Sequence, residues 1–290
     1  TSKMVHQDSV KQPWQWISHA WGRGREVDDE VSQKCVDLDG ELQTLDDMER
    51  GLAREVATDF LQPLRKSSRL WRFNVMRSAN KLEYKLFTDA WDFLMIARVS
   101  TESRKVSFFL YDSMEDVALE RRRPAFHMTY SSDKKEWCLM NEQCENCLYL
   151  PQHRSCNGKQ VLAVIKHVQE SAGTGTFNGM EVHLPIVHPD GERAVWCPVR
   201  GGCDQGHCVN SEEMHKLVTL KPAWNDEVDS LVLDFRGRRI ETSSKNFQIA
   251  GAHGHVICQF GKVGPATYGL DFNHPLSVVQ AFAMGLSTMF

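Results

Sequence analysis

The sequence predicts a mainly β fold, a sandwich or barrel of antiparallel strands, which follows an N-terminal helical extension and ends in an apolar helix. Two observations support this fold class. From residue 71 onward, many short segments alternate apolar and polar residues, which is the period of a strand with one buried face. The last sixteen residues, 275–290, contain no charged side chain. Many short strands separated by turn residues disfavour the parallel α/β class.

Residues 1–67 are predicted to form an irregular arm followed by a long amphipathic helix. The first 25 residues show neither the helical nor the strand period of apolar residues, but they contain Trp14, Trp16 and Trp21. From residue 27 to 64, apolar residues recur at spacings of three and four, and acidic residues crowd the other face. The arm, with its three tryptophans, either packs on the chain's own surface or anchors a protein partner, a role in which Trp is favoured. The helix at 27–64 either packs against its own domain or forms a coiled-coil or assembly contact. Anionic lipid would repel its acidic face.

The strands are predicted in residues 68–290. Trp71, Phe73 and Val75 alternate with polar residues, as do Leu82 and Leu86 with their neighbours, and a turn at 78–80 would join the two segments as a hairpin. The expected strands are 71–75, 82–86, 93–98, 106–111, 126–130, 161–165, 182–187, 231–235, 256–260 and 268–272.

The C-terminal segment 275–290 is predicted to be a helix that is apolar on all sides. At 1.5 Å per residue it would be roughly 22 Å long, which is too short for the hydrocarbon core of a bilayer. Burial inside the protein is therefore expected, with Asn273 and Pro275 as start signals. Strands that close around such a helix would cover its whole circumference.

The composition limits the function. The 290 residues are 41% hydrophobic, enough for a full-sized core, and the net charge is −4 at pH 7. A general nucleic-acid binder normally carries a basic balance, so no nucleic-acid partner is expected. No nucleophile elbow, phosphate loop or metalloprotease motif occurs. The sequence therefore predicts a binding module and not an enzyme.

Residues 217–290 resemble the signature of the tubby family in the order, spacing and identity of several short blocks. The strands expected between residues 71 and 111 resemble the family's opening strands more loosely. The resemblance implies that residues 68–290 form a closed antiparallel barrel threaded by the apolar C-terminal helix. The blocks that carry it are Trp224-Asn225-Asp226, residues 233–238 and 244–249, residues 259–263, Asp271-Phe272-Asn273, Pro275-Leu276 and residues 280–283.

The tubby resemblance implies binding of phosphoinositide head groups and a role as a membrane-tethering adaptor, in ciliary membrane traffic for several members. The family places basic residues just after a strand like 93–98, and convergent Lys and Arg donors suit phosphate oxygens. The expected location is cytoplasmic and peripheral to a membrane, the cilium included. The residues expected to bind the head group are Arg98, Arg104 and Lys105, with Arg121, Arg122 and Arg123 from a neighbouring loop.

An alternative function is a tubby-like barrel that has lost lipid binding and serves as a structural or accessory subunit of a larger assembly, an organellar one included. Glu102 adds a repelling charge to the expected head-group site. Together with the acidic face of the helix at 27–64, this charge favours the alternative.

Seven of the nine cysteines lie in two loop-like stretches, at about 138–156 and 197–208. Cys144 and Cys147 have the two-residue gap that lets two thiolates bind one zinc ion, and Cys203 and Cys208 would complete a four-ligand site. Structural zinc is the one cofactor that the sequence suggests. Reduced loop cysteines and disulfides are the alternatives.

Overall fold

A computed structural model describes residues 60–110, 123–142, 159–172, 175–191, 193–196, 214–227, 230–235, 237–251 and 254–290. The expected N-terminal arm and almost all of the expected helix at 27–64 lie outside the described residues.

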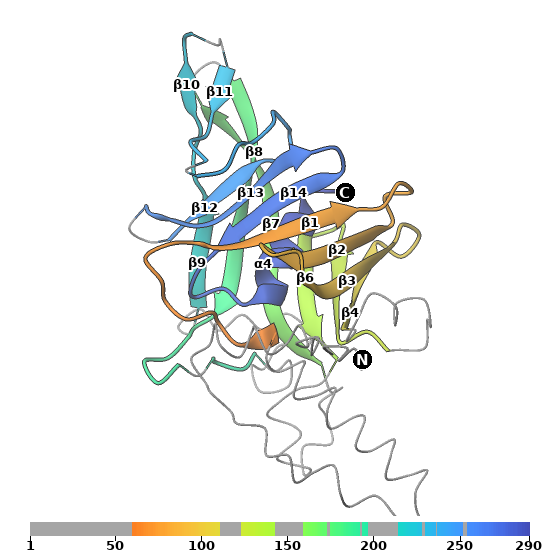
Figure 1. Ribbon diagram of the computed structural model, residues 1–290. Helices are drawn as coiled ribbons and strands as arrows, with labels where there is room; N and C mark the ends of the chain where they lie inside the picture. The colour runs from red at the N-terminus through yellow and green to blue at the C-terminus, as the bar shows by residue number, and fades with distance from the viewer. Residues whose placement is uncertain are drawn as a thin grey trace, which may run out of the picture.

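Twelve of the described strands form one closed barrel in which every neighbouring pair is antiparallel (Figure 1). Around the barrel the order is β1, β14, β13, β12, β9, β8, β7, β6, β5, β4, β3 and β2. The barrel strands are β1 Trp71–Arg77, β2 Glu83–Thr88, β3 Phe93–Ser100, β4 Lys105–Leu110, β5 Phe126–Ser131, β6 Glu136–Asn141, β7 Gln160–Ala172, β8 Gly175–Pro185, β9 Met214–Thr219, β12 Phe247–Ala250, β13 Val256–Gly264 and β14 Thr267–Phe272. The predicted mainly β fold is confirmed.

The C-terminal helix α4, Val278–Ser287, lies inside this barrel, and all ten of its residues are buried. Phe282 packs edge-on against Phe108 of β4, with ring centroids 5.8 Å apart. Gln280 Nε2 donates a 2.7 Å hydrogen bond to the carbonyl oxygen of Leu162 on β7. Because β4 and β7 are separated by other strands of the barrel, the helix must run through its interior. The burial expected for this apolar segment is confirmed.

The helix begins later than its expected start. Ser277 is the N-cap, and Ser277 and Gln280 form a capping box in which each side chain bonds the other residue's backbone N–H. Residues 60–64 cover this end of the barrel: Phe60, Leu61 and Leu64 are buried, and Leu64 N donates to the carbonyl oxygen of Leu276 at 3.1 Å. The packed domain therefore includes residues upstream of 68.

Three barrel strands escaped the sequence prediction, namely β6, β9 and β12. In β6, Trp137 and Leu139 point into the core, while Cys138 contributes to a second cluster on the outer face. Trp196 is part of that outer cluster, and its carbonyl oxygen accepts a 3.1 Å bond from Val161 N. Because both faces of β6 are covered, its residues lack the alternation that marks a half-exposed strand.

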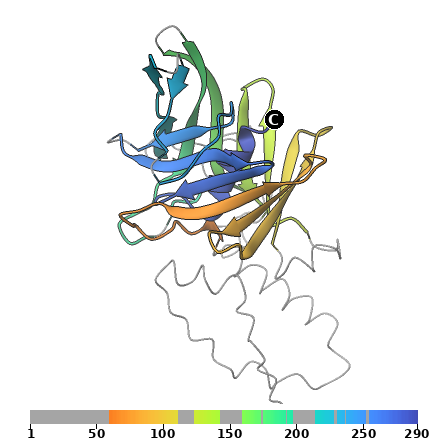
Figure 2. The same ribbon diagram turned by 45° about the horizontal axis from the view of Figure 1, so that its top comes forward.

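The expected strands at 161–165 and 182–187 belong to much longer strands, β7 and β8. Figures 1 and 2 show their outer ends standing clear of the barrel beside a small sheet of β10, Ala223–Asn225, and β11, Ser230–Val232. The expected strand at 231–235 continues past β11 only as irregular backbone. Polar side chains dominate this projecting arm, so its strands showed no apolar periodicity.

Candidate functional site

Three neighbouring hairpins meet at one end of the barrel. Their turns lie at residues 78–82, 101–104 and 132–135, between β1 and β2, β3 and β4, and β5 and β6. The first two turns are tied together where Val99 N donates to the carbonyl oxygen of Leu82 at 2.8 Å. We call this end of the barrel the hairpin rim.

Arg104 links the second hairpin to the third. It has a positive φ of 45°, and its Nη1 donates a 2.9 Å bond to Ser132 Oγ. The guanidinium also lies over the Tyr130 ring, 5.6 Å from the centroid. Lys105 follows on β4, opposite Ser100 and Thr129, and forms no ion pair with the residues that the structure describes. Arg104 and Lys105 thus lie side by side with no carboxylate partner in the described chain.

Arg98 has a different environment, although it lies on the same strand pair. Its Nε donates to Glu83 Oε1 of β2 at 3.0 Å, and its side chain is 27% exposed. The guanidinium stacks over the Phe109 ring, 5.4 Å from the centroid. Glu83 therefore neutralises the charge that Arg98 would offer to a ligand.

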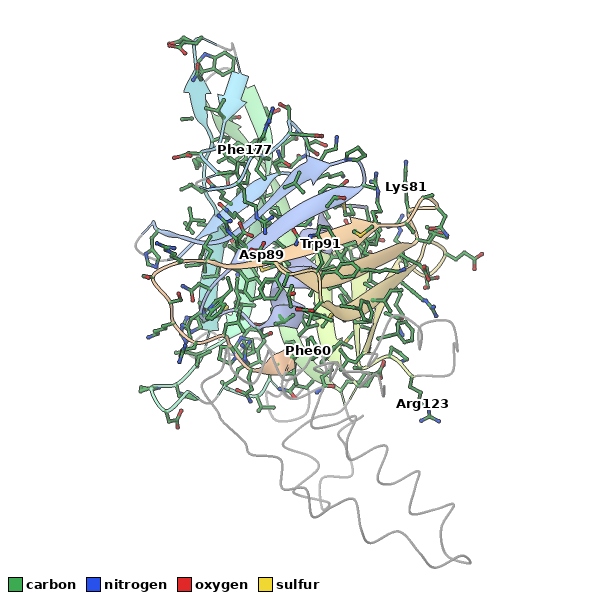
Figure 3. All side chains as sticks on the ribbon, viewed as in Figure 1. Phe60, Lys81, Asp89, Trp91, Arg123 and Phe177 are labelled. Carbon is green, nitrogen blue, oxygen red and sulfur yellow. The ribbon has the colours of Figure 1, made fainter. Side chains whose placement is uncertain are left out.

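Sequence reasoning missed three further basic residues of the hairpin rim. Lys81 occupies the first turn with a φ of 62°, and Lys134 and Lys135 occupy the third, Lys135 with a φ of 54°. All three are exposed, and Figure 3 shows Lys81 at the tip of its hairpin. The exposed carboxylates of these turns are Glu102 and Asp133. The hairpin rim therefore gathers more basic than acidic side chains, although the whole chain is acidic.

Apolar side chains are also exposed at the hairpin rim. Leu82 in the first turn is 40% exposed, Met76 at the end of β1 is 42% exposed and Phe290 is 49% exposed. Phe290 packs against Tyr84 and Trp137, with ring centroids 6.0 and 5.7 Å apart, so the end of the chain lies here as well. Basic and apolar groups thus share one surface.

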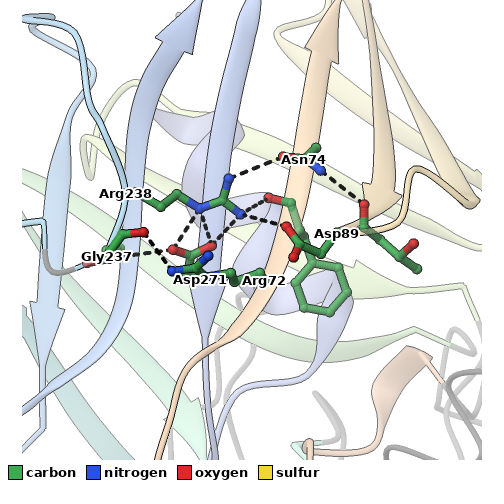
Figure 4. A network of polar contacts seen from close by, with 9 residues as sticks. Arg72, Asn74, Asp89, Gly237, Arg238 and Asp271 are labelled. Carbon is green, nitrogen blue, oxygen red and sulfur yellow. Dashed lines mark hydrogen bonds and ion pairs between the residues drawn. The ribbon is translucent and has the colours of Figure 1, made fainter.

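A strap formed by residues 233–235 and 237–241 crosses the outer face of β1, β14 and β13 and is held by Arg238. Arg238 Nε donates to both carboxylate oxygens of Asp271 on β14, at 2.8 and 2.9 Å. Nη1 donates to Asn74 Oδ1 at 3.2 Å and Nη2 to the carbonyl oxygen of Phe73 at 2.9 Å (Figure 4). The Asp271 side chain is 3% exposed, so the pair is nearly withdrawn from water.

Two facing glycines let the strap lie close to the barrel. Gly261 and Gly269 are paired across β13 and β14. A Cβ at Gly269 would lie 2.8 Å from Arg238 Cδ, and one at Gly261 would lie 2.8 Å from Ile240 Cδ1. The hydrogen-bond network of Arg238 and Asp271 extends to β13, since Gln259 Nε2 donates to Asp271 Oδ2 at 2.8 Å. Many of the signature residues noted in the sequence therefore belong to one structural unit.

Comparison with known proteins agrees with this architecture. The model of the Tub family matches residues 60–289 of the chain. The chain belongs to the Tub family. It is 34% identical over 140 residues to Tubby protein homolog 1 of Caenorhabditis elegans, a match that covers 45% of this chain and 33% of the relative. Over 135 residues it is 43% identical to Tubby-related protein 3 of Homo sapiens, with coverage of 45% and 30%.

A third relative, Tubby-related protein 3 of Mus musculus, is 35% identical over 137 residues, which are 45% of this chain and 29% of the relative. The Tub-family chain thus spans about a third of the length of these curated relatives. Within its described residues, the structure contains no helix with the length and apolar character needed to cross a membrane.

Of the remaining residues expected to bind a head group, Arg123 is described by the structure, and it lies away from the hairpin rim. Arg121 and Arg122 lie outside the described residues of this Tub-family chain. Arg123 is exposed, but it precedes Ala125, whose N donates to the carbonyl oxygen of Phe108 near the far end of β4. Most of β4, a strand of 6 residues that rises about 3.3 Å per residue, lies between this point and Arg104. Figure 3 shows Arg123 well apart from Lys81 of the hairpin rim.

The expected zinc ligands Cys144, Cys147, Cys203 and Cys208 also lie outside the described residues. The described cysteines are chemically quiet: burial raises the pKa of the Cys138 thiol to about 12 and raises the pKa of Cys258 as well. Among the described residues, no three His, Cys, Asp or Glu side chains are grouped to hold a metal ion. The zinc site stays a prediction.

Proposed function

We propose that this Tub-family chain is a non-enzymatic module that binds phosphoinositide head groups and tethers its partners to a membrane as an adaptor. One observation carries the proposal: three adjacent hairpins present five basic side chains at the hairpin rim, four in the turns and Lys105 at the start of β4, against two carboxylates. The basic residues are Lys81, Arg104, Lys105, Lys134 and Lys135, and the acidic ones are Glu102 and Asp133.

The chemistry of these side chains suits a phosphorylated lipid. Guanidinium and ammonium groups donate charge-assisted hydrogen bonds to phosphate oxygens. Each basic side chain near an anionic membrane contributes about 1 kcal/mol, so the excess of three gives about 3 kcal/mol, or roughly a hundredfold in affinity. Exposed Leu82 and Phe290 on the same surface would add apolar contact with the bilayer interface.

Arg98 has a supporting role in this proposal. It would have to leave Glu83 before it could bind phosphate, so its ion pair costs affinity. We assign Arg104 and Lys105 as the main donors on this strand pair, because their charges have no carboxylate partner among the described residues. Arg98→Gln is therefore expected to weaken vesicle binding less than Arg104→Gln does.

The test is co-sedimentation of the full chain with vesicles that contain a phosphatidylinositol bisphosphate. Phosphatidylserine vesicles of equal charge and neutral phosphatidylcholine vesicles are the comparison, each at low and high salt. Selective, salt-sensitive binding is expected. The triple variant Arg104→Gln/Lys105→Gln/Lys134→Gln should bind roughly a hundredfold more weakly.

The matched control Arg69→Gln/Lys221→Gln/Arg239→Gln removes the same charge from exposed positions elsewhere and should bind like the unmodified chain. Equal losses in the two triple variants would mean that net charge, and not the hairpin rim, drives binding. If Arg123→Gln weakens vesicle binding while Arg104→Gln/Lys105→Gln/Lys134→Gln does not, the membrane contact lies at the other end of β4.

A second function is favoured by the Arg98–Glu83 ion pair, which removes one of the expected head-group donors. It is that of a structural or accessory subunit of a larger assembly. The expected partner contacts are the N-terminal arm with its three tryptophans and the segment at 27–64. Absence of binding to any anionic vesicle, together with co-purification of a stable partner, would favour this function.

A further inference from the structure

We propose that the mouth of the barrel holds a second anion site, in which inward-facing Arg77, Lys245 and His167 bind a phosphate group beside the end of helix α4. This site is separate from the donors on the outside of the hairpin rim. It does not depend on vesicle binding.

Arg77 points into the barrel. It follows Phe73 and Val75 on β1, both fully buried in the core, at the two-residue period of one strand face. Its guanidinium lies 5.8 Å from the centroid of Tyr268, and its charge lowers the pKa of the Tyr84 hydroxyl group against the larger effect of burial, which raises it. Both tyrosines are almost wholly buried, so Arg77 carries its charge into the barrel end.

His167 and Lys245 reach the same region from other segments. His167 follows buried Ile165 on the inward face of β7, and its Nε2 lies 3.1 Å from Ser287 Oγ at the end of α4. Lys245 lies half-buried in the turn just before β12, whose first residue Phe247 belongs to the core. The three basic groups therefore come from β1, β7 and the segment before β12, and His167 contacts the last turn of the helix.

The electrostatics show that these groups act on one another. The pKa of Lys245 is lowered by burial and then by the charge of Arg77. The pKa of His167 is lowered by burial and then by the charge of Lys245. No acidic group within the described chain contributes to either change. Like charges thus lie together in a partly buried place, where a bound anion would relieve their repulsion.

The carbonyl groups at the end of α4 do not explain why basic side chains gather here, because hydrogen bonds within the chain already satisfy them. The carbonyl oxygens of Met284, Gly285 and Leu286 already accept hydrogen bonds from Ser287 Oγ, Thr288 Oγ1 and Met289 N, all within the last turn. Arg77 Nε is buried and donates to no acceptor in the part of the chain that the structure describes. A buried donor normally has a partner, so Arg77 Nε marks where the anion would bind.

The residue types favour phosphate as the ligand. The planar guanidinium of Arg77 suits two phosphate oxygens, and Lys245 adds a point charge. Neutral His167 can take up a proton when the anion arrives, which a doubly charged phosphate monoester would favour more than a carboxylate would. The source could be free phosphate or the phosphorylated head group of a lipid, and the experiment separates the two.

The experiment follows the imidazole signals of His167 by NMR in the full chain while inorganic phosphate is added. Phosphate should shift these signals saturably and raise the pKa of His167, so that binding is tighter at pH 6 than at pH 8. Lys245→Met should weaken phosphate binding roughly tenfold or more. Arg77→Gln should weaken phosphate binding to the same extent. If Arg77→Gln does not fold, Lys245→Met alone provides the test.

The outer triple variant Arg104→Gln/Lys105→Gln/Lys134→Gln is the control and should keep its phosphate response. Inositol bisphosphate titrated in the same way identifies the source: much tighter binding than inorganic phosphate indicates a lipid head group, and equal binding indicates free phosphate. No saturable shift of His167, or an unchanged response in Lys245→Met, would overturn the proposal. Because the outer variant affects vesicles and the inner variants affect phosphate, failure of one proposal is distinguishable from failure of the other.

Discussion

Replacing Arg238 by methionine is expected to lower the free energy of unfolding by about 3 to 5 kcal/mol. The guanidinium donates to Asp271, Asn74 and the carbonyl oxygen of Phe73, and the Asp271 side chain is 3% exposed. Without Arg238, the carboxylate keeps Gln259 as a donor but has lost its countercharge. The large cost comes from this uncompensated buried charge, because methionine keeps most of the apolar stem that covers Gly269.

Urea unfolding followed by circular dichroism measures this loss. For a domain of this size, 1 kcal/mol corresponds to roughly 2 to 4 °C, so the melting temperature should fall by roughly 6 to 20 °C. Lys262→Met is the matched control, since it breaks the 2.7 Å ion pair with Glu241 at the edge of the same strap. Those two side chains are 33% and 49% exposed, so a loss below about 1 kcal/mol is expected.

A double-mutant cycle tests the stated cause. Asp271→Asn removes the buried charge and keeps the shape, so the double variant Arg238→Met/Asp271→Asn should be more stable than Arg238→Met alone. If the double variant is no more stable, buried charge is not the source of the loss. A loss below about 1 kcal/mol in Arg238→Met itself would refute the whole account of the strap.

Three further outcomes are expected. Gly269→Ala should cost about 1 to 3 kcal/mol in urea unfolding because its Cβ would meet Arg238, whereas Gly264→Ala, with nothing within 4 Å, should change stability little. Burial and then the charges of nearby basic side chains lower the pKa of His274 to about 4, so its contribution to stability is complete above its unfolded pKa and is lost as pH falls from about 6.5 to 4. The fall in stability on acidification should be smaller in His274→Gln. Elemental analysis should find about one zinc per chain, and less than about half would contradict a site at Cys144, Cys147, Cys203 and Cys208.

Part of the fold was predictable from strands in which apolar and polar residues alternate. β1 shows this, since Phe73 and Val75 are buried and the side chains of Arg72 and Met76 are exposed. The alternation disappears where a second layer covers the outside, as it does for Cys138 on β6 beneath the segment that carries Trp196. A strand that is buried on both faces cannot be separated from other apolar runs by its period alone.

The candidate site was predictable only where its residues are neighbours in the sequence. Arg98, Arg104 and Lys105 were expected together, but Lys81 and Lys135 join them through the pairing of successive hairpins. The strand register decides these contacts, and a shift of one residue would reverse which side chains point outward. The same register sets the partner of Arg98, because it places Glu83 directly across from it.

The three arginines Arg238, Arg98 and Arg104 show why composition alone did not locate the binding surface. Arg238 meets a buried carboxylate and holds the strap, and Arg98 meets a half-exposed carboxylate and is neutralised. Arg104 meets only a hydroxyl group and an aromatic ring among the described residues, so its charge remains available to a ligand. Whether a carboxylate faces the arginine therefore separates the structural roles from the binding role. An acidic chain can therefore present a basic surface wherever its strands leave arginine and lysine without such a partner.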